Sequence, residues 1–430
     1  MKVLFSAIGS TDPISNCADG GMLHICRVYH PDKIYLYLSK EMCKYHDMDD
    51  RYCKAVRLLE EEMEWQCEIE VIRDETMENV QIFDAFIISF EKIISAIREK
   101  DQPEQLYLNV SSGTPAMKCS LQIISMLWNN IQAIQVSTPQ KSSNKYHEDK
   151  DSYDLAVQWE CNEDRKEGFE NRCSVSDAKY LLDRIRKENI HKYLEVYDYE
   201  AAKMMANTLS VQPSKQFLDC LNLAIERNRL NLKFVNGMRG KCQVSDWFPI
   251  VQDREMKEYE YMLSMQTKLW KRQYMDFIRD ITPIFFSLSE KVLKKYCKLR
   301  FEDIGKKNRE GVFCLSLDKL RTQKIKPQER WGNHTNISSF VIFKIMEQKC
   351  KEERVLELMK NIRTVEREVR NLAAHEIVGV TKGWIKNRTK FEPEQIMDML
   401  FTFGKYAGLD ISAEDRKIYN TMNEHLWELL

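Results

Sequence analysis

The chain lacks the paired cysteines that zinc ribbons and redox dithiols use. Its 13 cysteines include no C-x-x-C pair, and an odd number argues against a complete disulfide framework. We therefore expect a reducing, cytoplasmic compartment. The sequence also predicts no metal site and no bound cofactor.

Long apolar runs are missing as well. No uninterrupted stretch approaches the roughly 18 to 20 residues that span a bilayer, so we expect no membrane segment. The start, Met1-Lys2-Val3-Leu4-Phe5-Ser6-Ala7-Ile8, is too short for the apolar region of a signal peptide and is ended by Asp12-Pro13. We interpret it as a buried strand.

The chain also has no excess of charge of one sign. Its formal net charge is −1, so it has no polycationic field and any contact with a nucleic acid must be local. The composition, 43% hydrophobic and 30% charged, is typical of a folded protein. Because 430 residues exceed what one core usually organises, we expect two domains.

Residues 1–160 alternate short β-rich runs with amphipathic helical stretches. This pattern predicts βαβ units and a largely parallel sheet, which is an α/β fold of the Rossmann-like kind. The predicted strands are Val3–Ile8, Lys33–Leu38, Cys67–Ile72, Gln105–Val110, Ile131–Val136 and Tyr153–Gln158. The predicted helices between them are Arg51–Met63, Val80–Glu99 and Pro115–Trp128.

The second half is helical in its periodicity. The clearest stripes are Met256–Trp270, Tyr274–Cys297, Ser338–Cys350 and Glu353–His375, and no repeat period is present. The polar stretches 138–152 and 161–176 are predicted loops, and strand signals end in the second. We therefore divide the chain into an α/β domain (1–165), a helical linker (166–250) and an all-α domain (251–430).

Two loops in the N-terminal half are rich in small hydroxyl residues: Gly9-Ser10-Thr11-Asp12-Pro13 and Ser111-Ser112-Gly113-Thr114-Pro115. Each follows a predicted strand, and open α/β sheets bind ligands beyond the carboxyl ends of their strands. The second loop leads into the helix of Lys118, whose free N–H groups and dipole suit a phosphate. Neither loop is a G-x-G-x-x-G or Walker motif, which argues against a dehydrogenase or a P-loop NTPase. Ordinary turns use the same residues, so for either loop alone the two interpretations are even.

The segment from Glu366 to His375 carries polar groups suited to acid–base chemistry. A stripe at three- and four-residue spacing predicts a helix with one buried face, and it consists of Leu358, Ile362, Val365, Val369 and Leu372. Asn371 and His375 share a face, with Arg370 one residue away. Gly379 is a suitable helix stop, so His375 falls in the last turn, where the dipole favours the protonated ring.

Cleavage of RNA by its own 2′-hydroxyl needs a group that moves protons and a cation that stabilises the phosphorane. Histidine titrates near neutral pH, and arginine supplies a cation with paired donors. Taken as two residues alone, Arg370 and His375 are more often a surface ion pair and a helix cap.

The wider pattern carries a family resemblance. Arg370-Asn371-Leu372-Ala373-Ala374-His375 resembles the R-x4-H motif of HEPN-family ribonucleases. The loop Gly9–Pro13 and the segment Asn109-Val110-Ser111-Ser112-Gly113-Thr114-Pro115 resemble those of the CARF domains of type III CRISPR defence systems. Together these segments resemble the stand-alone CARF–HEPN accessory ribonucleases of type III-A systems, over nearly the whole chain.

The resemblance implies a cytoplasmic homodimer that cuts single-stranded RNA without a metal ion, at a composite site where two HEPN helices meet. It implies that Arg370, His375, Asn371 and Glu366 are the catalytic residues. In our interpretation Glu366 pairs with Arg370 at i,i+4 spacing. No stable protein partner is expected.

The resemblance further implies activation by a cyclic oligoadenylate, the tetramer or the hexamer, lying across the two-fold axis. The implied ligand-binding residues are Gly9, Ser10, Thr11, Asp12, Asn109, Ser111, Ser112, Gly113, Thr114 and Lys118. Some CARF domains of this kind also cleave their activator slowly, and Thr114 and its neighbouring hydroxyls are the candidates here.

Two rival functions remain at this stage. A ligand-responsive transcription regulator would need a recognition helix with a basic face, and the second half shows no convincing helix-turn-helix. A non-catalytic HEPN-like scaffold would bind a partner protein and show no RNase activity with any ligand.

Overall fold

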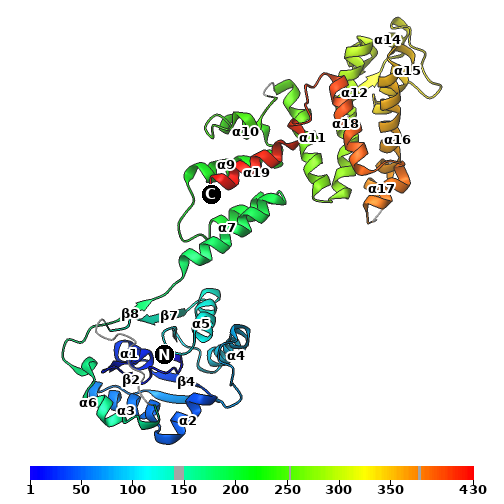
Figure 1. Ribbon diagram of the computed structural model, residues 1–430. Coiled ribbons are helices and arrows are strands. Elements are labelled where there is room, and N and C mark those ends of the chain that lie inside the picture. Colours follow the sequence, from blue (N-terminus) through cyan, green and yellow to red (C-terminus); the bar gives the residue numbers. More distant parts are fainter. Residues whose placement is uncertain (140–149, 251–252, 376–378) are drawn as a thin grey trace. The chain divides into compact units, whose positions relative to one another are not determined.

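The computed structural model describes residues 1–139, 150–250, 253–375 and 379–430 (Figure 1). The chain forms two compact units, Met1–Leu182 and Asp183–Leu430. Each unit has hydrophobic core residues of its own.

The first unit is built on a six-stranded sheet with the order β5-β4-β1-β6-β7-β8. Its strands are β1 (Lys2–Ala7), β4 (Lys33–Ser39), β5 (Glu68–Asp74), β6 (Gln105–Asn109), β7 (Ile131–Val136) and β8 (Cys173–Val175). The first five are parallel, and β8 runs antiparallel to β7. A two-residue hairpin, β2 (Ile14–Ser15) and β3 (Ala18–Asp19), follows β1. The predicted, largely parallel sheet is confirmed.

Helices cover both faces of this sheet. They are α1 (Gly21–Tyr29), α2 (Lys40–Asp49), α3 (Arg51–Met63), α4 (Phe83–Asp101), α5 (Pro115–Leu127) and α6 (Leu155–Glu160). Side chains of β1 alternate between the faces, because successive strand residues point to opposite sides. Leu4 packs in the core shared with α1 and α3, whereas Val3 and Phe5 pack in the core shared with α4 and α5. The result is a three-layer α/β/α domain.

The predicted strand Tyr153–Gln158 is wrong, because residues 155–160 form helix α6. The Asp154 carboxylate accepts hydrogen bonds from the backbone of Ala156 and Val157, which caps this helix. The sixth strand is β8 instead, in a stretch that the sequence predicts as a loop. A strand of three residues at a sheet edge carries too little alternation to be recognised from its sequence.

The second unit is helical. Its helices are α7 (Lys179–Glu195), α8 (Tyr199–Ala206), α9 (Lys215–Asn228), α10 (Leu232–Met238), α11 (Asp253–Trp270), α12 (Tyr274–Cys297), α13 (Phe301–Ile304), α14 (Leu317–Thr322), α15 (Ser339–Lys349), α16 (Glu353–His375), α17 (Lys382–Thr389), α18 (Pro393–Ala407) and α19 (Ile418–Glu428). The predicted bounds of α12 and α16 agree with the structure. The sequence did not predict the small sheet of β9 (Gly305–Lys307) and β10 (Phe313–Leu315).

Helix α12 is the centre of this bundle. It packs against α11, α15, α16 and α18, and its buried face includes Phe277, Ile281 and Leu288. On α16, Ile362, Val365 and Val369 of the predicted stripe are fully buried. The amphipathic pattern of α16 therefore docks that helix into the bundle and sets the direction in which it ends.

Candidate ligand and RNA-cleavage sites

The first candidate site lies where the chain reverses its direction of travel across the sheet. From β1 the chain builds β4 and β5 on one side, and it then returns to place β6 on the other side of β1. The loops that follow β1 and β6 therefore flank a topological switch point, which is where open α/β sheets bind their ligands. These are the two hydroxyl-rich loops.

The two loops touch through glycine backbone. A Cβ atom on Gly9 would lie 2.4 Å from the Gly113 nitrogen. Gly113 itself has a positive φ of 82°, and a Cβ there would lie 2.8 Å from the Met117 sulfur. Both positions need glycine, because any side chain would force the loops apart.

Asp12 fastens the first loop from within. Its side chain is 6% exposed and accepts hydrogen bonds from the Gly9 amide (2.9 Å), the Met22 amide (3.0 Å) and the Ser112 hydroxyl (3.1 Å). Burial raises the pKa of Asp12 above its usual value, although these hydrogen bonds work in the opposite direction. The carboxylate thus connects the loops after β1 and β6 to α1, and it points into the interior of the unit.

Asn109 does the same for the second loop. Its amide is fully buried and donates to the hydroxyls of Ser6 (2.9 Å) and Ser112 (2.8 Å), while its oxygen accepts from the Ser111 amide (2.9 Å). Ser6 is not predictable from the sequence, because a serine within an apolar strand gives no signal of its own. Asn109 and Asp12 therefore shape the site.

Thr114 caps helix α5. Its hydroxyl accepts a hydrogen bond from the Met117 amide (3.4 Å) and donates to the Val80 carbonyl (2.7 Å). Lys118 lies one turn further along α5 and is partly exposed, and its charge helps to lower the pKa of Asp12. Ser10 and Thr11 are exposed, and Ser111 is partly exposed. These groups line the open side of the loops.

The start of α1 is a third part of this site that the sequence analysis missed. A Cβ on Gly21 would lie 2.6 Å from the Ser112 hydroxyl, and one on Gly20 would lie 2.5 Å from the Thr11 carbonyl. The signal was a Gly-Gly pair just before a helix, which brings free N–H groups close to the loops. Three backbone segments therefore converge at the switch point.

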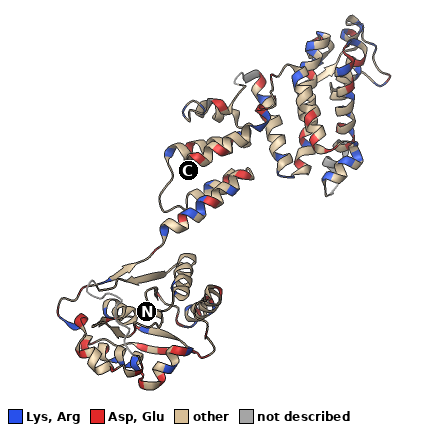
Figure 2. Ribbon diagram, viewed as in Figure 1, with Lys and Arg blue, Asp and Glu red and all other residues tan. Residues whose placement is uncertain are grey.

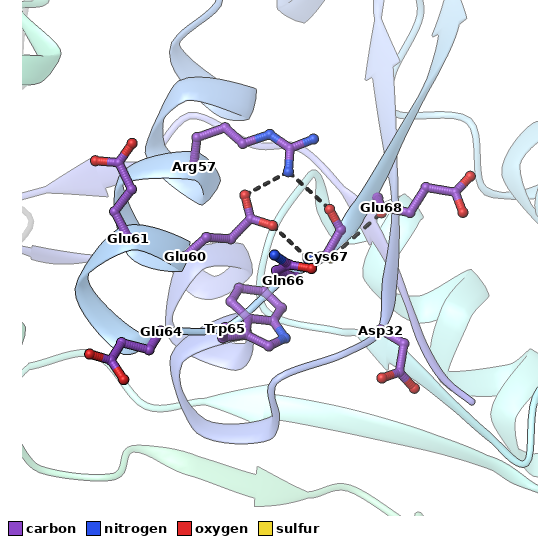
Figure 3. Close-up of a pocket in the computed structure, with 9 residues that line it drawn as sticks. All are labelled: Asp32, Arg57, Glu60, Glu61, Glu64, Trp65, Gln66, Cys67 and Glu68. Atoms are coloured by element: carbon purple, nitrogen blue, oxygen red, sulfur yellow. Dashed lines mark hydrogen bonds and ion pairs between the residues drawn. The ribbon is translucent and has the colours of Figure 1, made fainter.

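A large cavity lies near the starts of β4 and β5, at the opposite ends of the strands from the two loops (Figure 3). It has a volume of about 770 Å³ and is lined by Asp32, Arg57, Glu60, Glu61, Glu64, Trp65, Gln66, Cys67 and Glu68. Arg57 is occupied by Glu60 (2.6 Å) and by the Cys67 carbonyl (3.0 Å). Carboxylates dominate the lining, so this cavity repels an anionic nucleotide.

The second candidate site is at the end of α16. Arg370, Asn371 and His375 are in the last six residues of this helix, and their side chains lie outside the described residues. Glu366, one turn earlier, is fully buried. Its two oxygens accept from the Ser339 hydroxyl at 2.8 and 2.7 Å, and Arg363 donates to it at 2.7 Å. Glu366 therefore anchors α16 to α15, and its predicted pairing with Arg370 remains a prediction.

Helix α17 brings positive charge next to α16 (Figure 2). Lys382, Lys386, Arg388 and Lys390 are all exposed, and two of them are paired with Glu392 and Glu394 at the start of α18. This local positive surface fits a chain with a net charge of −1. Among the described residues, no helix has the length and apolar character needed to cross a membrane.

An α/β switch-point site combined with a helical bundle that carries an R-x4-H motif defines a protein of the CARF–HEPN class. Three family models match this chain: the Csm6 CARF domain (68–173), the Csm6 6H domain (176–228) and the Csm6 HEPN domain (247–427). The chain belongs to the Csm6 family of CRISPR-associated endoribonucleases.

Individual relatives agree with this assignment. The CRISPR system endoribonuclease Csm6 of Mycobacterium tuberculosis (strain ATCC 25618 / H37Rv) is 29% identical over 425 residues, which is 96% of each chain. That of Enterococcus italicus is 32% identical over 242 residues, 54% of this chain and 55% of the relative. The solved structure of Enterococcus italicus Csm6 bound to cyclic hexa-2′-fluoro-hexa-dAMP covers 100% of both chains, with a TM-score of 0.70 and 21% identity.

Proposed function

We propose that this protein is a cytoplasmic, homodimeric endoribonuclease of CRISPR defence that a cyclic oligoadenylate activates. The main support for ligand binding by the first unit is the convergence of the loop after β1, the loop after β6 and the start of α1 at the switch point. Backbone N–H groups and hydroxyls there suit ribose, adenine and phosphate, each hydrogen bond contributing on the order of 1 kcal/mol and more where a phosphate is charged. The Enterococcus italicus relative, bound to a cyclic hexanucleotide analogue, supports this choice of ligand.

The loop residues divide into two roles in this proposal. Asp12, Asn109 and Ser112 are buried and hold the loops in shape. Ser10, Thr11, Ser111 and Lys118 remain accessible, at least in part, to contact the activator. Gly9 and Gly113 let the backbones approach each other, and the ring lies over them.

In the nuclease half, His375 moves protons between the 2′-hydroxyl, the phosphorane and the leaving oxygen, and Arg370 stabilises the charge on the phosphorane. Asn371 helps to orient the phosphate, and two copies of α16 form one composite site in the dimer. No step needs a metal ion, because protein groups supply both the proton transfer and the positive charge. The basic surface of α17 guides single-stranded RNA to the end of α16.

Slow cleavage of the activator is the finer part of the proposal. The hydroxyls of Thr114 and Ser111 lie at the loop that would hold the ring. Thr114 is hydrogen bonded to Val80 and Met117, so its first role is to cap α5.

The test is an RNA-cleavage assay with cyclic tetra-adenylate and cyclic hexa-adenylate side by side, each with and without EDTA. We expect one of the two rings to switch on cleavage and EDTA to leave the cleavage rate unchanged. Cleavage that needs a divalent ion would contradict the HEPN mechanism, and cleavage without any ring would contradict the sensor. The match of the HEPN model to residues 247–427 favours this function over a transcription regulator.

A further inference from the structure

Two groups of potential metal ligands occur among the described residues of the first unit. One consists of Asp19, His24 and Asp164, and the other of His46, Asp50 and Cys53. In each group the ligand atoms all lie within 4.8 Å of one another. Their surroundings differ, and the difference decides which of them can hold a cation.

In the Asp19 group, arginine side chains already balance the negative charges of both carboxylates. Arg27 donates to Asp19 at 2.6 Å, and Arg172 donates to Asp164 at 2.6 Å. The Nε2 atom of His24 accepts from the Arg172 amide at 3.0 Å, which leaves its Nδ1 atom protonated and facing the two carboxylates. With two guanidinium groups in contact, this cluster has no unbalanced charge for a metal.

The His46 group has no such cation. Among the described residues, the one basic side chain within 4.0 Å of the Asp50 carboxylate is the His46 imidazole, at 3.3 Å. The nearby guanidinium groups serve other acceptors: Arg57 pairs with Glu60 and Arg73 with Asp47. The cluster thus combines a carboxylate, an imidazole and a thiol, which are the ligand types that zinc binds in proteins.

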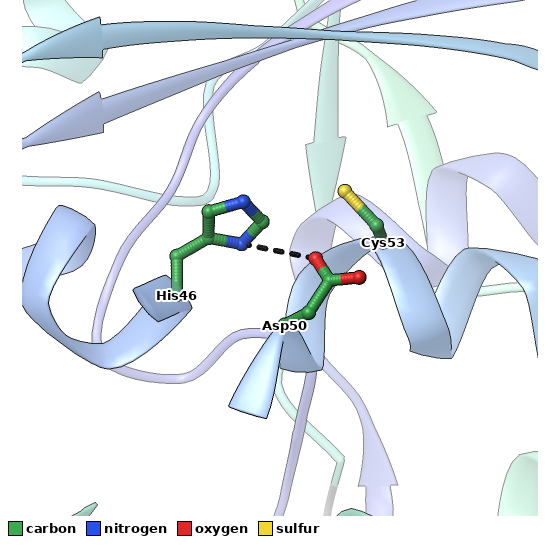
Figure 4. A group of neighbouring side chains, drawn as sticks. All are labelled: His46, Asp50 and Cys53. Carbon is green, nitrogen blue, oxygen red and sulfur yellow. Dashed lines mark ion pairs between the residues drawn. The ribbon is translucent and has the colours of Figure 1, made fainter. Parts of the chain in front are cut away.

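The three side chains are held in position by the corner between α2 and α3 (Figure 4). His46 is in the last turn of α2, Cys53 is in the first turn of α3, and Asp50 lies between the helices with a positive φ of 56°. The His46 ring stacks on the buried Tyr52 ring, with 6.1 Å between centroids and 15° between planes. The imidazole is therefore oriented before any metal arrives.

One atom of the cluster lacks a satisfied partner. The Nδ1 atom of His46 is buried and makes no hydrogen bond, although it lies 3.3 Å from Asp50 Oδ1. A buried ring nitrogen without a hydrogen bond is costly, and coordination to a metal would satisfy it. Asp50 is half exposed, with 49% of its side chain accessible, so a cation can enter from solvent and keep a water as fourth ligand.

We propose that His46, Asp50 and Cys53 bind one Zn²⁺ ion that clips α2 to α3. Zinc is bound by His46 Nδ1, an Asp50 oxygen and Cys53 Sγ, and the Cys53 thiol releases its proton to solvent as the Zn–S bond forms. The ligands come at spacings of four and three residues, a pattern that a search for C-x-x-C pairs does not find.

This inference is independent of the proposed nuclease function, because it is tested without RNA or activator. The full-length protein is dialysed against zinc, washed, and analysed for metal by mass spectrometry. We expect about one zinc ion per chain in the unmodified protein and less than about a tenth of that in His46→Gln and in Cys53→Ser. The matched control Cys161→Ser changes an exposed cysteine elsewhere in the same unit and should keep the metal.

Folding and coordination are separated by two further measurements. Circular dichroism of the zinc-free proteins checks that each variant folds, and zinc should raise the melting temperature of the unmodified protein but of neither variant. Replacement of zinc by Co²⁺ should give a thiolate-to-metal charge-transfer band that Cys53→Ser lacks. A folded unmodified protein that retains no zinc would overturn the proposal. So would zinc that both variants retain and His24→Gln removes, because the metal would then lie in the Asp19 group.

Discussion

Single residues decide whether the loops after β1 and β6 can approach each other, and Gly113 is the clearest case. Gly113→Ala should abolish activation, because its positive φ of 82° and the Met117 sulfur 2.8 Å away leave no room for a methyl group. Gly168→Ala is the matched control, since Gly168 has a φ of 79° and nothing within 4 Å of the added Cβ. The measurement is the activator concentration that gives half-maximal RNA cleavage. Equal values for the two variants would contradict this role of Gly113.

Arg370 and His375 carry the chemistry in our proposal. Arg370→Ala and His375→Ala should each reduce the cleavage rate by at least about a hundredfold, the range of removing a proton-transfer group or an electrostatic stabiliser. Binding of cyclic oligoadenylate should be unchanged, because the ligand site is in the other unit. Isothermal calorimetry with the activator and a fluorescent RNA reporter give the two readouts. A His375→Ala protein that cleaves near the normal rate would exclude this assignment.

Thr114 combines a structural and a proposed chemical role, and two substitutions separate them. Thr114→Ala removes the cap of α5 and should cost about 1 kcal/mol of stability. Thr114→Ser keeps the hydroxyl and the cap, so it should keep the slow decay of RNase activity that activator cleavage causes. The experiment preincubates protein and activator, then adds reporter RNA at intervals. If activity in Thr114→Ala decays as fast as in the other proteins, Thr114 has no part in activator cleavage.

At the scale of elements, the buried network around His24 joins the β2–β3 hairpin, α1 and the segment that leads into β8. Burial by itself would raise the pKa of Asp164. Hydrogen bonds from His24 and from the Asp19 amide, together with the Arg172 charge, lower it to about 2 instead. This network therefore fixes the outer end of the sheet that the sequence analysis missed.

The network makes the first unit sensitive to acid. A carboxyl whose pKa falls from 3.8 unfolded to about 2 folded contributes on the order of 2 kcal/mol, present above pH 4 to 5 and lost as pH falls towards 2. Urea unfolding at pH 7, 4 and 3 measures this contribution. Asp164→Asn should be less stable than the unmodified protein at pH 7, and the difference should shrink at pH 3. A difference that does not change with pH would contradict the assignment.

The whole molecule places a sensor and a nuclease in one chain, and the proposed composite nuclease site requires two such chains. Sedimentation analysis should therefore give twice the chain mass of 51.0 kDa with or without activator. Because each proposed site needs two copies of α16, the cleavage rate per chain should fall when the protein is diluted below its dimer dissociation constant. A rate per chain that stays constant while the protein becomes monomeric would place the whole site in one chain.

Much of this molecule follows from local sequence. Strong periodicity determined the bounds of α3, α12 and α16, because a buried stripe at helical spacing has one stable geometry. Five of the six strands of the main sheet were predictable as short β-rich runs between helical stretches. The loops after β1 and β6 and the R-x4-H segment were also visible as short, ordered sets of residue types.

Other features of the molecule depend on contacts between residues that are distant in the sequence, and only the tertiary structure decided them. Asp12 and Ser112 are 100 residues apart, so nothing local indicates that the predicted ligand residue Asp12 is buried and fastens the loops. The strand β8 forms because it pairs with β7, and α6 forms because Asp154 caps it, although its residues alternate like a strand. The corner between α2 and α3 gathers His46, Asp50 and Cys53 from two helices, and only the angle between those helices makes them neighbours. Periodicity sets the elements, whereas burial and long-range pairing decide which side chains face a ligand.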